Sequence, residues 1–284
     1  MLIGDGNIEG IVLSDSINYL DSSARGNVVI ASSHGGIYVA YKAAVSGARA
    51  VILNDAGVGR EEAGIACLGY CERIGMAAAV VSHTSARIGD VDDMLRRGIL
   101  SYVNRVAKSV NCKPGMPCAR AAISLKRAPL PFSTPPAYEE IRFLISEGPP
   151  RIVCIDSASL VKTEDAGQIV ITGSHGGLIG GLREKAFNIQ ALVAIFNDAG
   201  VGIDQAGIGR LEPLNERGIA AVTVAHTSAR IGDSRSTYYE GILSHCNPLA
   251  IQLGASRGFT VMEFVEQVCR CVTSTPPSEN EKGV

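Results

Sequence analysis

The six residues Asn54-Asp55-Ala56-Gly57-Val58-Gly59 occur a second time, letter for letter, as Asn197-Asp198-Ala199-Gly200-Val201-Gly202. Each copy is preceded by Ser-His-Gly-Gly, at 33–36 and 174–177, and followed by His-Thr-Ser-Ala-Arg-Ile-Gly-Asp, at 83–90 and 226–233. The copies are offset by 141 residues at the first histidine (175 − 34) and by 143 at the aspartate (198 − 55). Because each copy is far longer than a solenoid repeat, the pattern indicates a duplicated domain.

The duplication also predicts where the chain divides. We expect a first α/β repeat over residues 1–136, a linker over 137–150, a second α/β repeat over 151–277 and a tail over 278–284. Eight of the twelve prolines fall between residues 113 and 150. Proline disrupts a sheet interior and favours extended chain, so the part of this region after a helical run near 119–126 is predicted to be an extended strap between the halves.

Short runs of apolar residues predict the strands of each repeat. Examples are the β-branched runs at 28–31 and 169–172, and residues 50–53, which end at the hexapeptide. Residues 37–47 place apolar side chains at helical spacing, and a second helix is expected over 61–73. Strands alternating with helices predict, in each repeat, a mainly parallel, doubly wound sheet in three α/β/α layers. Ligands of such sheets bind beyond the carboxyl ends of the strands, where the duplicated motifs lie.

The composition of the chain limits the classes of partner that the protein is expected to bind. The net charge of −2 over 284 residues gives no basic field for nucleic acid and no polybasic surface for anionic lipid. No apolar run is long enough to span a membrane, and the first residues do not resemble a signal peptide. We therefore expect a cytoplasmic protein that binds a small-molecule substrate, with a homo-oligomer left open. The eight cysteines lack paired metal spacing and are expected to be free thiols, so no cofactor and no structural metal are predicted.

The histidines of the first motif are the predicted catalytic residues. His34 and His175 each follow a strand and precede two glycines, whose backbone N–H groups could receive an oxyanion. We expect the imidazoles to act as general acid or base. The alternative is a histidine that caps its own helix or bonds a neighbouring loop.

The aspartates of the hexapeptide are the predicted partners of these histidines. Asp55 and Asp198 stand one strand away and could orient the imidazoles. Alternatively, Asn and Asp before Ala-Gly-x-Gly only form the turn. The Gly-x-Gly lacks the full spacing of a dinucleotide site.

The third duplicated motif, at residues 83–90 and 226–233, offers hydroxyl groups and a cation. Arg87 and Arg230 could clamp an anionic group of the substrate, although an internal ion pair between Arg87 and Asp90 would explain the same residues. A divalent metal held by His34, Asp55, His83 and Asp90 is a further alternative. The predicted substrate-binding residues are Ser33, Gly35, Gly36, Asn54, Thr84, Ser85 and Arg87, with Ser174, Gly176, Gly177, Asn197, Thr227, Ser228 and Arg230 in the second repeat.

The order of strand, Ser-His-Gly, helix, strand and Asn-Asp-Ala-Gly resembles the core of the caspase-like cysteine peptidases. The resemblance covers about 60 residues of each half and implies a related fold. His34 and His175 match the catalytic histidine of that family, but Gly57 and Gly200 stand where its nucleophilic cysteine would be. The resemblance therefore argues against peptidase activity.

These patterns together predict a small-molecule enzyme. The favoured reaction is hydrolysis of an amide, ester or lactone that carries an anionic group, by His and Asp acid-base chemistry. Lyase or isomerase chemistry by proton abstraction would use the same residues. A non-catalytic ligand-binding pseudo-enzyme is the remaining alternative.

Overall fold

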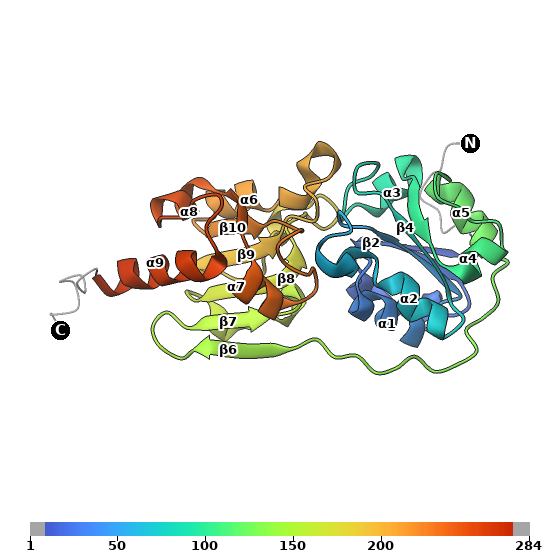
Figure 1. The fold of residues 1–284 in the computed structure, drawn as a ribbon, viewed down its shortest axis with the longest axis horizontal. Helices are drawn as coiled ribbons and strands as arrows, with labels where there is room; N and C mark the ends of the chain where they lie inside the picture. The colour runs from blue at the N-terminus through green and yellow to red at the C-terminus, as the bar shows by residue number, and fades with distance from the viewer. Residues whose placement is uncertain (1–8, 275–284) are drawn as a thin grey trace.

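The computed structural model describes residues 9–274, so the predicted tail at 278–284 lies outside the described residues. It contains two mixed, mostly parallel sheets with helices, which fit two tandem α/β domains (Figure 1). The first sheet comprises β1 (Ile11–Ser14), β2 (Val28–His34), β3 (Ala50–Asn54), β4 (Ala77–Val81) and β5 (Leu100–Val103). The second comprises β6 (Arg142–Ser146), β7 (Ile152–Ile155), β8 (Ile169–His175), β9 (Val193–Asn197), β10 (Ala220–Val224) and β11 (Leu243–Cys246).

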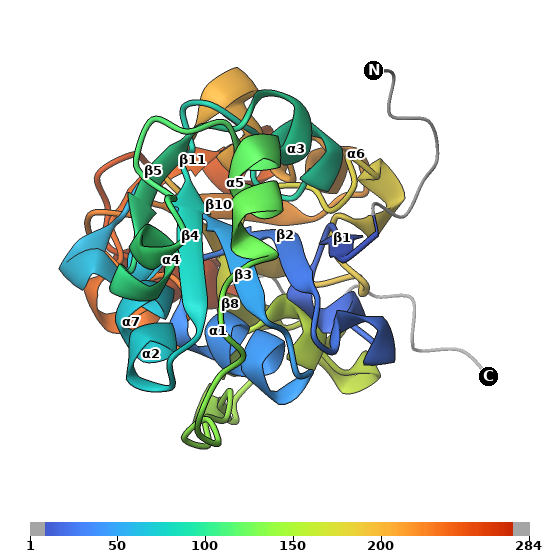
Figure 2. The same ribbon diagram turned by 90° about the vertical axis from the view of Figure 1, so that its right-hand side faces the viewer.

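In the first half the strands lie in chain order, β1-β2-β3-β4-β5, and all neighbours are parallel except β4 and β5. Helices α1 (Ile37–Val45) and α2 (Cys67–Arg73) pack on one face, and α3 (Val91–Arg97) and α5 (Cys118–Leu125) pack on the other (Figure 2). The short α4 (Arg105–Ser109) follows β5. The central strands are covered on both sides, which explains why their sequences are apolar at successive positions.

The second half repeats this order, with β7 to β11 matching β1 to β5. Its helices are α6 (Leu211–Glu216), α7 (Ser234–Glu240), α8 (Pro248–Gln252) and α9 (Val261–Ser274). No counterpart of α1 follows β8, because the segment up to β9 forms turns around Gly180 and Gly181 and one 3-10 turn, η6 (Arg183–Lys185). The halves therefore differ most at this place.

Part of the expected linker belongs to the second sheet. Residues 142–146 form β6, which pairs antiparallel with β7 at the edge of the sheet. Before β6, residues 129–141 of the strap run without helix or strand along the first half, where Tyr70 Oη donates to the carbonyl of Pro136 at 2.6 Å. A short antiparallel edge strand tolerates nearby prolines, which an interior strand does not.

The duplicated hexapeptides meet each other at the boundary between the halves. A Cβ built on Gly57 would lie 2.8 Å from Cα of Gly200, so the two turns are in direct backbone contact. The surrounding hydrogen bonds are reciprocal: the backbone N–H of Arg60 donates to the carbonyl of His226 at 2.8 Å, and that of Ile203 to the carbonyl of His83 at 2.9 Å. The boundary therefore has pseudo-twofold symmetry, with an apolar seam of Ala56, Ile88, Ala199 and Ile231.

Each turn follows an unusual left-handed path. The four residues from Ala56 to Gly59 have φ values of 47°, 77°, 64° and 71°, and the matching residues of the second copy repeat them closely. Left-handed φ is unfavourable for a β-branched residue such as Val58. Positive φ continues at Glu61 and Glu62, so the helix expected over 61–73 is instead a 3-10 segment, η3 (Arg60–Ile65), followed by α2.

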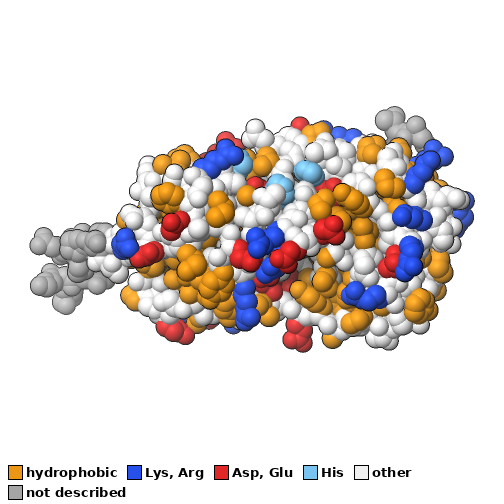
Figure 3. Space-filling model, viewed as in Figure 1, with side chains coloured by type: hydrophobic (Ala, Val, Ile, Leu, Met, Phe, Trp, Pro, Cys, Tyr) orange, Lys and Arg blue, Asp and Glu red, His pale blue; other side chains and the backbone are white. Residues whose placement is uncertain are grey.

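Charged residues reinforce the boundary at the surface. Arg230 forms ion pairs with Glu61 and Glu240 at 3.1 and 3.4 Å, and Arg87 pairs with Asp204 at 3.0 Å. Acidic and basic side chains lie side by side over the middle of the face in Figure 3. Within residues 9–274, no helix combines the length and apolar character needed to cross a bilayer. All eight cysteines are free thiols.

Candidate functional site

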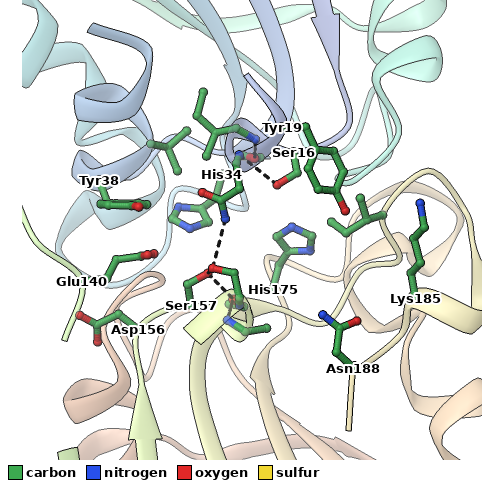
Figure 4. Close-up of a pocket in the computed structure, with 18 of the residues that line it drawn as sticks. Ser16, Tyr19, His34, Tyr38, Glu140, Asp156, Ser157, His175, Lys185 and Asn188 are labelled. Carbon is green, nitrogen blue, oxygen red and sulfur yellow. Dashed lines mark hydrogen bonds between the residues drawn. The ribbon is translucent and has the colours of Figure 1, made fainter. Parts of the chain in front are cut away.

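A cavity of about 190 Å³ lies between the two halves, at the carboxyl ends of β2 and β8. Both halves contribute matching positions: His34 and His175 from the strand ends, and the turns that follow β1 and β7. Figure 4 shows the two imidazoles facing the same space, with Tyr38, Glu140 and Asp156 on one side and Lys185 and Asn188 on the other. The remaining polar lining residues are Ser16, Asn18, Tyr19, Ser33, Ser157, Ser159, Ser174 and Arg210.

The local backbone fixes the hydrogen-bonding state of both imidazoles. Nδ1 of His34 accepts a hydrogen bond from the N–H of Gly36 at 3.1 Å, and Nδ1 of His175 accepts one from Gly177 at 3.1 Å. A ring nitrogen that accepts cannot carry the proton of the neutral ring, so that proton lies on Nε2. Each neutral imidazole is therefore an N–H donor.

Burial keeps both rings neutral. Desolvation lowers the pKa of His34 to about 4. The pKa of His175 is lowered well below its ordinary value by burial, with further contributions from the nearby charge of Arg210 and from His34. Since Nδ1 is occupied, the rings suit polarisation of a carbonyl group better than the removal of a proton. The role of general acid or base, expected from the sequence, stays a prediction.

Each of these two imidazoles is covered by a glycine from the other half of the molecule. A Cβ on Gly232, in the third motif of the second half, would lie 3.2 Å from Cε1 of His34. A Cβ on Gly89, in the first half, would lie 3.7 Å from Cε1 of His175. Each histidine thus depends on the other half for its enclosure.

Glu140 supplies a titratable carboxyl group to the cavity. It comes from the strap immediately before β6, where Oδ2 of Asp156 accepts the N–H of Ile141 at 2.9 Å and the N–H of Asp156 donates to the carbonyl of Ile141 at 3.1 Å. Burial raises the pKa of Glu140 to about 7; the Tyr38 hydroxyl lowers it, and Asp156 raises it further. A carboxyl group with such a pKa can both take and return a proton at neutral pH.

A second cavity of about 250 Å³ adjoins the first. It shares His34, Tyr38 and Glu140 with the main cavity and is closed by Tyr138 and Arg230. The ring of Tyr138 lies 6.3 Å from that of Tyr38, so the strap forms one wall of both spaces.

The expected pairing of the aspartates with His34 and His175 is wrong. Oδ1 of Asp55 bonds Nδ1 of His83 at 2.8 Å, and Oδ1 of Asp198 bonds Nδ1 of His226 at 2.9 Å. Asp55 also accepts the backbone N–H of Gly57, so it helps to form the turn. An aspartate directly after β3 has neighbouring strands on both sides, and here it reaches His83, two residues beyond β4, instead of His34, which ends β2.

The glycine N–H groups are not available to an oxyanion. Gly36 and Gly177 donate to the histidines, while Gly35 and Gly176 donate to the backbone carbonyls of Asn54 and Asn197, each at 2.8 Å. The expectation of free backbone donors at this turn is therefore also wrong.

The remaining predicted substrate-binding residues divide between the cavity and the scaffold. Ser33 and Ser174 line the cavity, and their hydroxyls accept the N–H groups of Ile17 and Ala158. The side chains of Asn54 and Asn197 are buried and bond their own turns. The residues that lie outside the main cavity's lining are Asn54, Asn197, Thr84, Ser85, Arg87, Thr227, Ser228 and Arg230.

The metal alternative does not fit the arrangement. His34 lines the cavity, but Asp55, His83 and Asp90 do not. His83 is instead bonded to Asp55. In the part of the chain from 9 to 274, no group of three or more His, Cys, Asp or Glu side chains is placed to hold a metal ion.

Sequence reasoning missed Glu140 and Arg210. Glu140 lies in the strap, and Arg210 occupies the position that Cys67 has in the first copy, so neither belongs to a duplicated motif. The available signals were the lost helix after His175 and this Cys-to-Arg difference.

Acidification should destabilise the protein through His34. Its folded pKa of about 4 lies below the unfolded value of 6.5, so its contribution is fully present above pH 6.5 and is lost as the pH falls toward 4. The loss at pH 4.5 is on the order of 2 to 3 kcal/mol. His34→Asn keeps an acceptor for the Gly36 N–H but does not titrate. Urea unfolding at pH 7 and 4.5 should show a smaller difference for the variant, and equal differences would contradict this explanation.

Comparison of the chain with protein-family models, with curated protein sequences and with solved structures returned no match.

Proposed function

We propose that the cavity between the halves is the active site of an isomerase or lyase that moves a proton on the carbon next to a carbonyl group. The observation that carries this proposal is the meeting of Glu140, whose pKa is about 7, with two neutral imidazoles in one cavity. A carboxylate base beside a neutral imidazole donor is a known arrangement for enolisation.

The proposed step uses three groups. The Glu140 carboxylate removes a proton from the carbon, and the C–H electron pair forms a C=C bond while the carbonyl oxygen becomes an enolate. The Nε2–H groups of His34 and His175 hydrogen-bond that oxygen and stabilise its developing charge. Glu140 then returns the proton to the same carbon or a neighbouring one, or the enolate expels a leaving group. When a leaving group is expelled, Glu140 gives its proton to that group, so the carboxylate is regenerated and no oxidant is needed.

Hydrolysis of an ester, amide or lactone is the second candidate. It is favoured by Ser157, whose hydroxyl lies against Glu140 and bonds the hydroxyl of Ser159 at 2.8 Å. A carboxylate beside a hydroxyl group could activate that hydroxyl or a water molecule. The imidazole N–H groups would then stabilise a tetrahedral oxyanion.

Deuterium exchange separates these reactions. The protein is incubated in D₂O with a panel of short 2-oxo and 3-oxo acids, and proton NMR follows the loss of the C–H signal next to the carbonyl. We expect exchange well above the rate without protein for at least one compound. If no compound exchanges while carboxylate-bearing lactones or esters are cleaved, hydrolysis is the function. If compounds bind but none reacts, the site only binds ligand.

The variant His34→Asn tests the role of the donor. Asparagine retains an oxygen near the position of Nδ1, so the bond from Gly36 can persist while the Nε2–H group is lost. We expect the exchange rate to fall by roughly 10²- to 10³-fold. Retention of the full rate would show that this imidazole does not polarise the carbonyl.

A further inference from the structure

Arg210 is a buried cation on the wall of the cavity. Its side chain is held by two backbone carbonyls, with Nε donating to Gly177 at 2.9 Å and Nη1 donating to Ala186 at 2.7 Å. The guanidinium lies over the ring of Phe196 at 5.0 Å. The residue is only 5% exposed, and it still lines the cavity. These contacts hold the guanidinium in one place.

This cation has no anionic partner in the part of the chain that the structure describes. Within residues 9–274 Arg210 forms no ion pair with an Asp or Glu, and its Nη2 donates to no protein acceptor. By contrast, Arg87 and Arg230, which the sequence suggested as anion clamps, are paired with carboxylates. Burial lowers the pKa of Arg210 to about 10, so it remains charged at neutral pH. A buried charge without a partner is costly, and a bound anion would offset that cost.

Lys185 adds a second cation to the same side. Its side chain lines the cavity, and within residues 9–274 it forms no ion pair. Figure 4 places Lys185 and Asn188 across the cavity from Glu140 and Asp156, with the two imidazoles between. The cavity is therefore acidic at one end and cationic at the other.

We propose that Arg210 and Lys185 bind the carboxylate of the substrate, which makes the substrate a small carbonyl acid. This assignment rests on the proposed function for the reacting end of the molecule, but anion binding itself can be measured separately. A carboxylate near Arg210 would direct the adjacent carbonyl oxygen to the imidazoles and the reacting carbon toward Glu140. The volume of about 190 Å³ suits an acid of a few carbon atoms.

The difference between the repeats supports a dedicated subsite. In the first half, Cys67 occupies the position of Arg210, and α1 follows His34. In the second half, the chain after His175 forms turns, and this loop carries Lys185 and Asn188 to the cavity. The arginine and the open loop thus occur together on one side only.

Oxalate is a suitable probe, because its planar dianion resembles the enolate of a 2-oxo acid and does not turn over. Isothermal titration on the full chain should show binding to the unmodified protein. Arg210→Lys should weaken binding by about 10- to 100-fold, as expected for loss of a charge-assisted hydrogen bond. Arg210 also caps two carbonyls, so Lys185→Gln, at an exposed residue, provides a second variant that does not disturb the core; it should weaken binding severalfold.

Arg183→Gln is the matched control. It removes the same charge two residues from Lys185, but Arg183 pairs with Glu212 and Glu216 and lies outside the cavity lining. Its oxalate affinity should stay within about twofold of the unmodified protein. The proposal is overturned if the unmodified protein does not bind oxalate at millimolar concentration, or if Arg210→Lys and Lys185→Gln bind as tightly as Arg183→Gln. Oxalate binding without deuterium exchange of any oxo acid would preserve the subsite and reject the proposed reaction.

Discussion

Replacing Glu140 by glutamine should lower the deuterium exchange rate of a bound carbonyl acid by about 10²- to 10⁴-fold, which is the usual contribution of a general base. The amide has nearly the same shape as the carboxyl group but cannot accept the proton. The fold should persist, because Asp156 holds the adjacent backbone through Ile141 and does not need the Glu140 carboxyl group. NMR exchange at saturating substrate measures the effect, and far-UV circular dichroism checks the fold.

Glu139→Gln is the control for this change. Glu139 is the preceding residue of the strap, is exposed, and does not line the cavity. Its exchange rate should match that of the unmodified protein.

The pH dependence gives an independent check on the same group. Only the ionised carboxylate acts as base, so the rate should fall as the pH is lowered through about 7. A rate that stays constant between pH 8 and 5.5 would assign proton removal to another residue.

Gly57→Ala should be among the most destabilising single changes in the protein, at roughly 3 kcal/mol or more. Gly57 has φ of 77°, and a Cβ there would lie 2.8 Å from both Cα of Gly200 and Cδ2 of His226. Backbone at that distance cannot rotate away, so the turns of the two halves must separate. The free energy of unfolding, measured in urea, should show the loss.

Gly26→Ala isolates the conformational part of this effect. Gly26 has a similar φ of 71°, but a Cβ there would meet nothing within 4 Å. We expect a loss of about 1 to 2 kcal/mol from the left-handed backbone alone. If Gly57→Ala costs no more than Gly26→Ala, the close contact between the two halves does not contribute to stability.

The fold could be predicted from the sequence because the apolar runs that form the strands occur in both copies. The apolar runs before Ser33 and Ser174 form β2 and β8, and the α/β class with two sheets is confirmed. The pairing of residues across strand ends could not be predicted in the same way. Asp55 directly follows β3, which lies between β2 and β4, and spacing alone does not tell which neighbouring histidine it bonds.

Only some residues of the candidate site could be predicted from the sequence, for a related reason. Repetition identified His34 and His175, whose strand-end positions bring them into one cavity. It also favoured Arg87 and Arg230, which are paired with carboxylates across the boundary. Residues that are repeated in both copies include those that join the two halves as well as those that face a ligand. Glu140 and Arg210 occur once each, so a search for repeats could not find them.

The strap that joins the halves has a consequence for what the molecule can evolve. Two identical chains related by a true twofold axis would have to place the same group at both ends of a shared pocket, because every substitution appears twice. Tethering them into one polypeptide removes that restriction. The cavity has the Glu140 carboxyl group from the strap on one side and the Lys185 ammonium group on the other, and the Arg210 guanidinium bonds the carbonyl of Ala186, next to Lys185; a symmetric dimer could not adopt this polarity. Fusion therefore allows the two ends of a pseudo-symmetric pocket to differ in charge, so that the pocket can bind an asymmetric molecule in one orientation.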